Sequence, residues 1–534
     1  MPPRLGRRPF LGLSLAAGGA LAMGAARPRA AAPGSGARRP ELEEATLAGL
    51  GEALASGKLT ARGLADACLA RIEAVDRRGP ALRAVVETNP DALAIAEALD
   101  RERAAGKVRG PLHGIPVLVK ENIDSADRML TTAGSLALVD APRPARDALV
   151  VERLRAAGAV LLGKTNLSEW ANLRGDRSTS GWSGRGGLTR NPYALDRNCS
   201  GSSSGSAAAV AASLVPVAVG TETDGSIVSP SSLCGLVGVK PTIGLVSRTG
   251  IIPIAHSQDT AGPMARSVRD AALLLGALDG PDPEDAATTA AGRPGPRDYL
   301  AGLDAGALAG ARLGVVKGLL GQHAAVDRVM RPAFELLRGR GATLVEVELT
   351  SKSYEAAELQ VLLYEYKADM AAYLARRGGK LKGLADIAAF NEAHAAQELS
   401  WFGQELVLQG AAKGGLDAPE YLAAKEACAN ARKELEAGLE KEKLDAFIGP
   451  TDGPAWVTDL VNGDHYGPSS STFAAVAGTP HVTVPAGDVH GLPVGLSFFG
   501  RAWSEPRLLA LAYAFEQASK ARKAPTYPAT LKLL

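Results

Sequence analysis

The sequence has few cysteines and histidines, almost no net charge, and no long uninterrupted apolar run in its main body. The four cysteines form no C-x-x-C pair and the seven histidines are scattered, so their spacing builds no metal site, and we expect no metal or other cofactor. Because 59 basic residues balance 57 acidic ones, the net charge of +2 gives no field that would favour nucleic acid or an acidic partner. These shortages favour a small neutral ligand. With 46% hydrophobic residues, the 534-residue chain can nevertheless bury a large core.

The first 32 residues predict an export signal. Arg7 and Arg8 precede a weakly apolar run of Ala, Gly and Leu at 11–26, and the segment ends in small residues. This pattern is typical of twin-arginine signals, which the twin-arginine export machinery recognises. A membrane anchor is disfavoured because the run is shorter than the roughly 20 residues that span a bilayer. We therefore expect residues 1–32 to be cleaved and the mature protein to be periplasmic or extracellular, outside any membrane.

The rest of the chain, 40–534, alternates short apolar runs with amphipathic helical patterns. Runs such as GIPVLVK, GAVLLGKT, VPVAVGT and LCGLVGVK are separated by helical stretches such as DALVVERLRAAG, as expected of an α/β fold. Long helical patterns fill about 350–443, and strand-like runs follow them. Length alone would allow about three domains. The same α/β pattern on both sides of the helices also fits a single α/β domain with a helical insertion around 350–443, which is our prediction.

Two short motifs match known active-site patterns but lack the context that those patterns require. Gly158–Thr165, GAVLLGKT, matches the phosphate-binding loop of NTPases, yet its four central residues are apolar and predict a buried strand. Gly201–Gly205 matches the nucleophile elbow G-x-S-x-G with Ser203 at its centre, but a polar, proline-containing loop precedes it where an elbow needs a strand. Both interpretations are disfavoured, and ATP dependence of any activity would support the first.

A third set of residues could carry acyl transfer. Ser226 follows Thr223, Asp224 and Gly225 in a tight turn after the strand VPVAV. Such a turn places free backbone N–H groups beside the serine, as an oxyanion hole requires. Lys120 ends the apolar run GIPVLVK and should be largely buried, although a lysine at a strand end usually reaches solvent. Neither feature identifies an active site by itself.

The serine-rich stretch CSGSSSGSAA at 199–208 completes a pattern that resembles the amidase signature family. The resemblance is most specific over 200–275 and is supported by LHGIPVLVKENID and LGKTNLSEWANLRG upstream and by AGTPHVTVPAGDVHGLPVGLSFFG downstream. It implies a large mixed β-sheet covered by helices on both faces, and an enzyme that hydrolyses carboxamides without a cofactor. The matching positions are Lys120 (catalytic lysine), Ser202 (bridging serine on a cis peptide), Ser226 (acylated nucleophile), and Thr223, Asp224 and Gly225 (oxyanion loop).

The chemistry of these residue types is consistent with the assigned roles. An amide needs a strong nucleophile and an acid that protonates the leaving amine, and no Ser-His-Asp set is evident in this sequence. A lysine can act as the base instead if burial keeps it neutral and no carboxylate lies beside it. The next residue, Glu121, should point to the opposite face of the strand. Ser202 would then pass a proton between Lys120 and Ser226.

Positions that differ from the common family pattern indicate which of the family's activities to expect. Ser200, Ser204 and Asp224 stand where many members have glycine, and Val228 stands where many, including the tRNA-dependent amidotransferase subunits, have arginine. These departures count against transamidation. The segments LLYEYKAD, DIAAFNEAHAAQELSWFGQEL and AWSEPRLL are similar to the bacterial peptide amidases, which remove the C-terminal amide of peptides. We therefore expect a peptide amidase, while a general or aryl amidase and an exported binding protein without activity remain alternatives.

Two segments are candidate walls of the substrate cleft. LSEWANLRG at 167–175 and GWSGRGGLTRNPY at 181–193 carry Trp170, Asn172, Trp182 and Arg185, whose side chains could hold a peptide backbone. The alternative for the two tryptophans is packing in the core. We expect Asn172, Trp182 and Arg185 in particular to bind the substrate.

Overall fold

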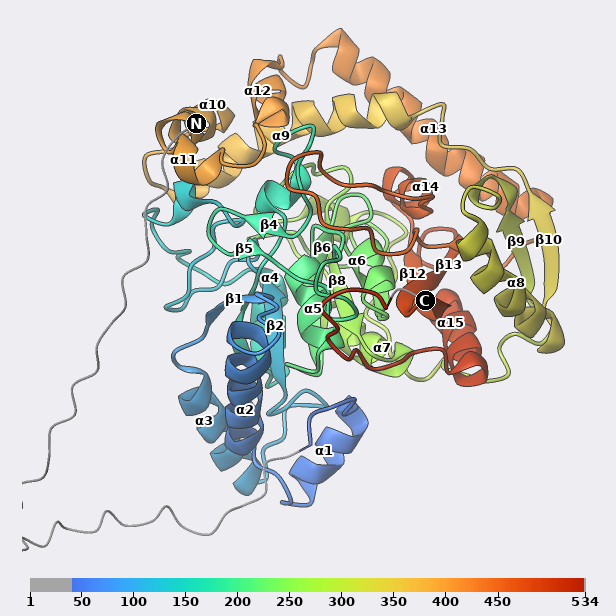
Figure 1. Cartoon of the computed structure of the whole chain (residues 1–534), viewed down its shortest axis with the longest axis horizontal. Helices are drawn as coiled ribbons and strands as arrows, with labels where there is room; N and C mark the ends of the chain where they lie inside the picture. The colour runs from blue at the N-terminus through green and yellow to red at the C-terminus, as the bar shows by residue number, and fades with distance from the viewer. Residues whose placement is uncertain (1–40, 533–534) are drawn as a thin grey trace, which may run out of the picture. The chain divides into compact units, whose positions relative to one another are not determined.

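An 11-stranded mixed β-sheet forms the centre of the fold, in the order β1-β3-β2-β6-β8-β7-β12-β13-β11-β9-β10 (Figure 1). The structure is a computed structural model that describes residues 41–532, and the predicted export signal at 1–32 lies outside the described residues. β2 pairs in parallel with β3 and β6, and β9 pairs in parallel with β10 and β11, whereas the other pairs are antiparallel. The predicted α/β fold with a large mixed sheet is confirmed.

The strands of the main sheet are short and mostly buried, as expected of apolar runs that are covered by other elements. They are β1 (Val85–Thr88), β2 (Pro116–Lys120), β3 (Val160–Thr165), β6 (Val217–Glu222), β7 (Val237–Lys240), β8 (Thr260–Ala265), β9 (Arg312–Val316), β10 (Thr343–Val347), β11 (Ala446–Pro450), β12 (His481–Val489) and β13 (Leu492–Phe499). β4 (Trp182–Ser183) and β5 (Gly187–Leu188) form a separate small hairpin. The motif GAVLLGKT thus supplies β3, whose six residues are all buried, and not a phosphate-binding loop.

Helices pack on this sheet in groups. α4 (Leu149–Ala156), α7 (Val268–Leu278), α8 (Ala324–Gly339) and α15 (Glu505–Ser519) contact one another and the strands. α5 (Ser204–Ala211) and α6 (Val228–Leu233) pack together and on the central strands. The remaining long helices near the N-terminal end are α1 (Leu47–Ala55), α2 (Ala61–Arg71) and α3 (Ala92–Ala104). In the part of the chain that the structure describes, no helix combines the length and apolarity needed to cross a membrane.

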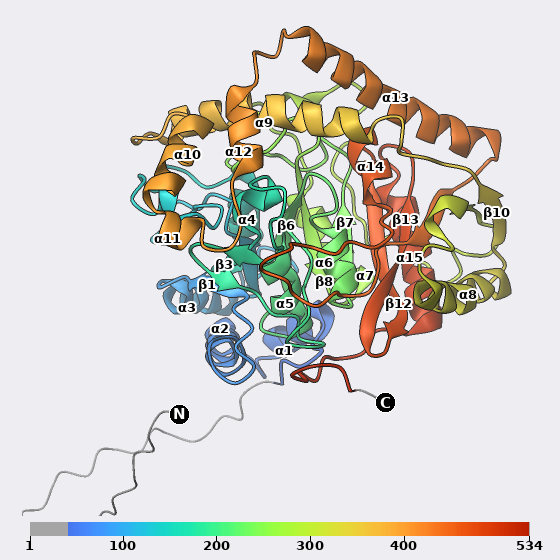
Figure 2. The ribbon, with the colours of Figure 1, turned by 45° about the horizontal axis from the view of Figure 1, so that its top comes forward.

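The chain between β10 and β11 forms a layer of helices, with α9 and α13 side by side along one edge of the fold (Figures 1 and 2). These helices are α9 (Glu355–Arg377), α10 (Leu384–Ala393), α11 (Ala395–Glu398), α12 (Glu405–Ala412) and α13 (Pro419–Lys441), and α13 also packs on α14 (Ser471–Ala477). A separate hydrophobic cluster joins Tyr366 and Met370 of α9 to Leu167 and Ile254 in loops of the main body and to Trp170 in the short 3-10 helix Glu169–Asn172. The helical layer therefore supports the loops at one edge of the sheet.

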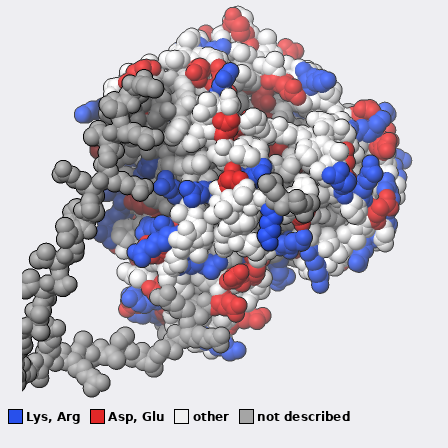
Figure 3. All heavy atoms as spheres, viewed as in Figure 1, with Lys and Arg blue, Asp and Glu red and all other residues white. Residues whose placement is uncertain are grey.

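The register of the parallel strands places the expected site residues at one edge. Val117 to Val119 of β2 lie opposite Val217 to Val219 of β6, so both strands end at the same side of the sheet. Lys120 is the last residue of β2, and the turn at 223–226 directly follows β6. Ends of neighbouring parallel strands commonly carry the active site of α/β proteins. Charged side chains on the face in Figure 3 are interspersed with broad neutral areas, as the net charge of +2 leads one to expect.

Candidate active site

Lys120 is buried at the end of β2, with no exposed surface. Its Nζ lies 2.7 Å from Ser202 Oγ, 2.9 Å from Thr221 Oγ1 and 3.2 Å from the carbonyl oxygen of Thr221. Burial lowers the pKa of Lys120 to about 7, although the carboxylates of Asp259 and Glu222 act in the opposite direction. The lysine can therefore lose its proton near neutral pH, as a general base must.

Glu121 points away from this lysine, as the strand geometry predicts. Its carboxylate accepts hydrogen bonds from the N–H and hydroxyl of Thr132, at 3.0 and 2.7 Å, and from the N–H of Gly134 at 2.7 Å. The guanidinium of Arg185 also pairs with it. The negative charge is thus neutralised on the far side of the strand and does not hold Lys120 in its charged form.

The serine-rich stretch runs between Lys120 and the turn after β6. The peptide bond between Gly201 and Ser202 is cis. Only glycine fits at position 201, because a Cβ there would lie 2.2 Å from Ser168 Oγ. The N–H of Ser203 donates to the carbonyl oxygen of Ser226 at 3.1 Å, which fixes this stretch against the turn that carries Ser226.

The turn at Thr223–Ser226 offers free backbone donors. Gly225 has a φ of 76°, a conformation that favours glycine. The carboxylate of Glu222 accepts the N–H groups of Ile227 and Val228, at 2.7 and 3.0 Å, and so fixes the chain just after the turn. Within residues 41–532, the N–H groups at positions 224 to 226 have no acceptor. Unpaired donors beside a serine are what an oxyanion hole requires.

Ser226 opens into a cavity of about 350 Å³, which we call the front pocket. Its lining includes Asn172, Ser200, Gly201, Thr223, Asp224, Gly225, Ser226, Leu362, Asp452, Tyr466 and Thr472. Ser226 is 7% exposed, and its hydroxyl makes no hydrogen bond to other described residues. Two carboxyl groups lie in the lining: burial raises the pKa of Asp452 to about 7 and also raises the pKa of Asp224. The front pocket therefore holds an accessible serine hydroxyl among polar groups and backbone donors.

The structure brings together most, but not all, of the residues expected from the sequence. Asn172 lines the front pocket and donates from Nδ2 to Ser180 Oγ at 2.9 Å. Trp182 lies outside its lining and packs edge-on against Phe402, with ring centroids 5.1 Å apart. Arg185 also lies outside, because Glu87 and Glu121 both pair with its guanidinium.

The residues that depart from the family pattern fill internal positions beside the pocket. Ser200 Oγ lies 2.7 Å from Ser229 Oγ, and Ser229 in turn donates to the carboxylate of Asp452. Ser204 Oγ donates to the carbonyl oxygen of Ser200 at 2.5 Å. Asp224 accepts a hydrogen bond of 2.7 Å from the hydroxyl of Thr472. Ser200 and Asp224 thus extend the polar lining of the front pocket, whereas Ser204 lies outside it.

Sequence reasoning missed the wall contributed by the loop between β11 and α14. Asp452, Tyr466 and Ser469 reach the front pocket from this loop, more than 220 positions after Ser226. The signal was the polar stretch TDGPAWVTDLVNGDHYGPSSS, which follows the buried strand β11 and has no periodic pattern. Polar and aromatic residues in a loop after a strand are candidates for a site.

A group of possible metal ligands lies apart from these residues. Among the described residues, His256, Glu365 and Asp369 are the only set whose ligand atoms converge. These side chains already pair with one another, because His256 Nδ1 lies 2.9 Å from a carboxyl oxygen of Asp369 and His256 Nε2 lies 3.4 Å from one of Glu365. Neither the lysine nor the two serines depend on them.

Comparisons with known proteins place the chain in a family. The profile of the family described as Amidase matches residues 64–509. A probable amidase of Arabidopsis thaliana is 41% identical over 501 residues, which cover 91% of this chain and 92% of the relative. The crystal structure of native peptide amidase from Stenotrophomonas maltophilia is 51% identical, with a TM-score of 0.87, over 91% of this chain and 99% of that chain. A bacterial aryl acylamidase is 26% identical, with a TM-score of 0.77, over 92% of this chain and 100% of that chain. The protein described here therefore belongs to the amidase signature family and is an amide hydrolase.

Proposed function

We propose that the enzyme hydrolyses the C-terminal amide of peptides through Lys120, Ser202 and Ser226. The observation that carries the catalytic part is the contact of 2.7 Å between the buried Lys120 Nζ and Ser202 Oγ, beside the turn that presents Ser226. A lysine whose pKa lies near 7 is neutral in about half of the molecules at neutral pH and can accept a proton.

In the acylation step, the neutral Nζ takes the hydroxyl proton of Ser202 while Ser202 takes the proton of Ser226. Ser226 Oγ then attacks the amide carbon, and the carbonyl oxygen becomes an oxyanion. The unpaired N–H groups at positions 224 to 226 donate to this oxyanion, and removal of one such donor typically costs about a hundredfold or more in rate.

Collapse of the tetrahedral intermediate breaks the C–N bond. The proton held by Lys120 returns through Ser202 to the leaving nitrogen, which departs as ammonia from a primary amide. A water molecule then loses its proton along the same relay and attacks the acyl ester, so that a free carboxylate and the original serine are formed. The relay begins and ends in the same protonation state.

Two features support a peptide as the acyl part. The relative that shares 51% of its residues with this chain is a peptide amidase. The front pocket combines apolar side chains such as Leu362 with hydrogen-bonding groups such as Asn172 and Tyr466, the mixture that an uncharged peptide backbone requires. Buried Val228 occupies the position where amidotransferase subunits carry an arginine, which counts against transamidation.

Ammonia release from a matched series of amides tests this proposal. We expect kcat/KM to rise at least about tenfold from an amidated single amino acid to an amidated tripeptide, since contacts remote from the scissile bond also stabilise the transition state. Mass spectrometry should show that internal peptide bonds survive. Equal rates on simple aliphatic amides, or cleavage within the peptide, would contradict the peptide specificity, and the Ser226→Ala variant gives the background.

An aryl or general amidase is the second candidate, since an aryl acylamidase shares the fold. Simple anilides belong in the same series of substrates. Anilides cleaved faster than any peptide amide would favour this candidate.

We further propose that residues 1–32 direct the enzyme out of the cytoplasm. The support is the pair Arg7 and Arg8 before a short, weakly apolar run. Replacing both arginines by lysine should leave the precursor in the cytoplasm, as fractionation and immunoblotting would show. Unchanged export of the double variant would refute the twin-arginine route.

A further inference from the structure

A second cavity, of about 200 Å³, adjoins the front pocket, and we call it the rear cavity. Ala171, Thr223 and Ile254 line both cavities, so these three residues form the boundary between them. The rear cavity extends from Asn122 and Thr221 at its inner end to α9 at its mouth. The space beside the catalytic residues is thus larger than the NH2 group of a primary amide requires.

The inner end of the rear cavity is polar and buried. Asn122 is 3% exposed and lines the cavity, and its Nδ2 donates to Thr221 Oγ1 at 3.0 Å. Its Oδ1 has no partner among the described residues. This oxygen is itself buried, so the residue contributes polarity to the inner end without offering a free acceptor to a ligand.

This end lies on the side of the active site where the amine departs. The leaving nitrogen receives its proton from Ser202, and Lys120 then transfers a proton to Ser202. Thr221 accepts a hydrogen bond from Lys120 Nζ, and Asn122 donates to the same hydroxyl, so the residues around the proton donor are those that line the rear cavity. A substituent on the leaving nitrogen would point into this space.

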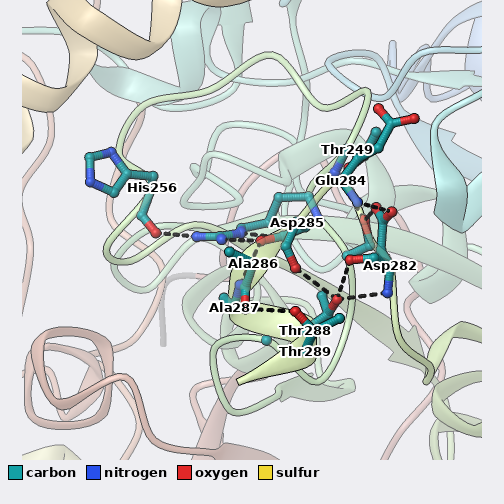
Figure 4. Close-up of polar contacts among 12 residues, drawn as sticks. Thr249, His256, Asp282, Glu284, Asp285, Ala286, Ala287, Thr288 and Thr289 are labelled. Atoms are coloured by element: carbon teal, nitrogen blue, oxygen red, sulfur yellow. Dashed lines mark hydrogen bonds and ion pairs between the residues drawn. The ribbon is translucent and has the colours of Figure 1, made fainter. Parts of the chain in front are cut away.

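The walls and the rim set the chemistry of that substituent. The middle of the cavity is apolar, with Ile251, Ile252 and Pro253 in its lining. The rim includes Glu284 and Asp285, and Figure 4 shows these two residues near Thr249, with the loop at 282–289 held by its own hydrogen bonds.

Most charged groups of the lining are paired. The guanidinium of Arg248 is taken up by Asp285 and by the carbonyl oxygen of His256. His256 pairs with Asp369, and Glu284 pairs with Arg146 outside the lining. Asp259 accepts hydrogen bonds from the hydroxyl of Thr223 and the N–H groups of Ile254 and Ala255. Because most charged groups of the lining are already satisfied, the apolar middle of the cavity is suited to an uncharged substituent.

We propose that the rear cavity is a leaving-group subsite for small apolar amines, so that the enzyme also cleaves N-alkylated C-terminal amides of peptides. This inference rests on the proposed function of the front pocket. Ser226 Oγ forms the ester bond as the C–N bond breaks, and the proton of Ser226 reaches the amine nitrogen through Ser202 and Lys120.

The test uses one acetylated tripeptide with four C-terminal groups: the primary amide, the methylamide, the propylamide and the hexylamide. We expect kcat/KM for the propylamide within tenfold of that for the primary amide. Ala372 is exposed on α9 at the mouth of the cavity. The variant Ala372→Trp should slow the hexylamide at least tenfold and the primary amide less than twofold. The matched control is Ala375→Trp, at an exposed position of the same helix outside the lining.

Other outcomes overturn one proposal or the other. A primary amide cleaved normally, with alkylamides below one hundredth of its rate, would refute the subsite alone. If the primary amide is not cleaved, the proposed function is refuted. Whether the subsite exists is then tested separately, by measuring the binding of hexylamine to the Ser226→Ala protein with ligand-observed NMR. Ala372→Trp should weaken this binding at least tenfold and Ala375→Trp should not. No binding, or equal loss in both variants, overturns the subsite.

Discussion

The pKa of Lys120 makes the rate depend on pH in a defined way. Burial lowers this pKa from 10.5 to about 7, and only the neutral amine can accept the proton of Ser202. A lysine with the ordinary pKa would be neutral in roughly one of 3,000 molecules at pH 7, whereas Lys120 is neutral in about half of them. We therefore expect kcat/KM to rise about tenfold per pH unit below 7, to level off above pH 8, and to reach only about 1% of the plateau at pH 5.

The assay is ammonia release from an acetylated peptide amide without titratable side chains, between pH 5 and pH 10 at constant ionic strength. Such a substrate does not change its own charge, so the profile reports the free enzyme. Circular dichroism at each pH controls for unfolding. A profile that is flat over the whole range, or one that rises only near pH 10, would show that a buried neutral Lys120 does not start the reaction.

Three further outcomes follow from the same contacts. Ser226→Ala should abolish ammonia release and Ser202→Ala should lower kcat/KM by several orders of magnitude, because the two hydroxyls act as one relay; near wild-type rates would exclude that relay. Thr221→Val removes a hydrogen-bond acceptor of the charged Lys120 Nζ, so the plateau of kcat/KM should fall and the acid limb of the pH profile should move below pH 7. Thr221→Ser keeps the hydroxyl and should leave both the plateau and the limb as in the wild type. Arg174 is fully buried and pairs with Glu169 at 3.0 Å, so Arg174→Met should lower the free energy of unfolding in urea by about 3 kcal/mol or more. An unchanged midpoint in urea would show that this ion pair is dispensable.

Much of the fold could be predicted from local patterns. The apolar runs that end at Lys120 and before Thr223 were predictable as strands, because each is short and is followed by a turn or helix. In the structure they are neighbouring parallel strands. The same reasoning identified GAVLLGKT as a strand. Composition and periodicity did not pair Lys120 with Ser202, which lie 82 positions apart; only the resemblance to a family did so.

The substrate-binding residues were harder to predict, because their roles depend on distant partners. Arg185 looked free in the sequence, yet Glu87 and Glu121 from two different strand regions pair with it. Trp182 packs on Phe402, which lies in the loop between α11 and α12. Conversely, Asp452 and Tyr466 line the front pocket from a loop without periodicity. Long-range contacts of this kind leave no signal in a local stretch of sequence.

The order of the strands determines when activity can arise during synthesis. β12 and β13 come late in the chain, yet they occupy the middle of the sheet, between β7 and β11. Until the ribosome has released this segment, β7 has an open edge and β11, β9 and β10 have no connection to the rest of the sheet. Pairings between such distant segments form slowly. A nascent chain that already carries the whole serine stretch and Ser226 therefore still lacks the middle of its sheet, and we expect activity only once β12 and β13 have been translated.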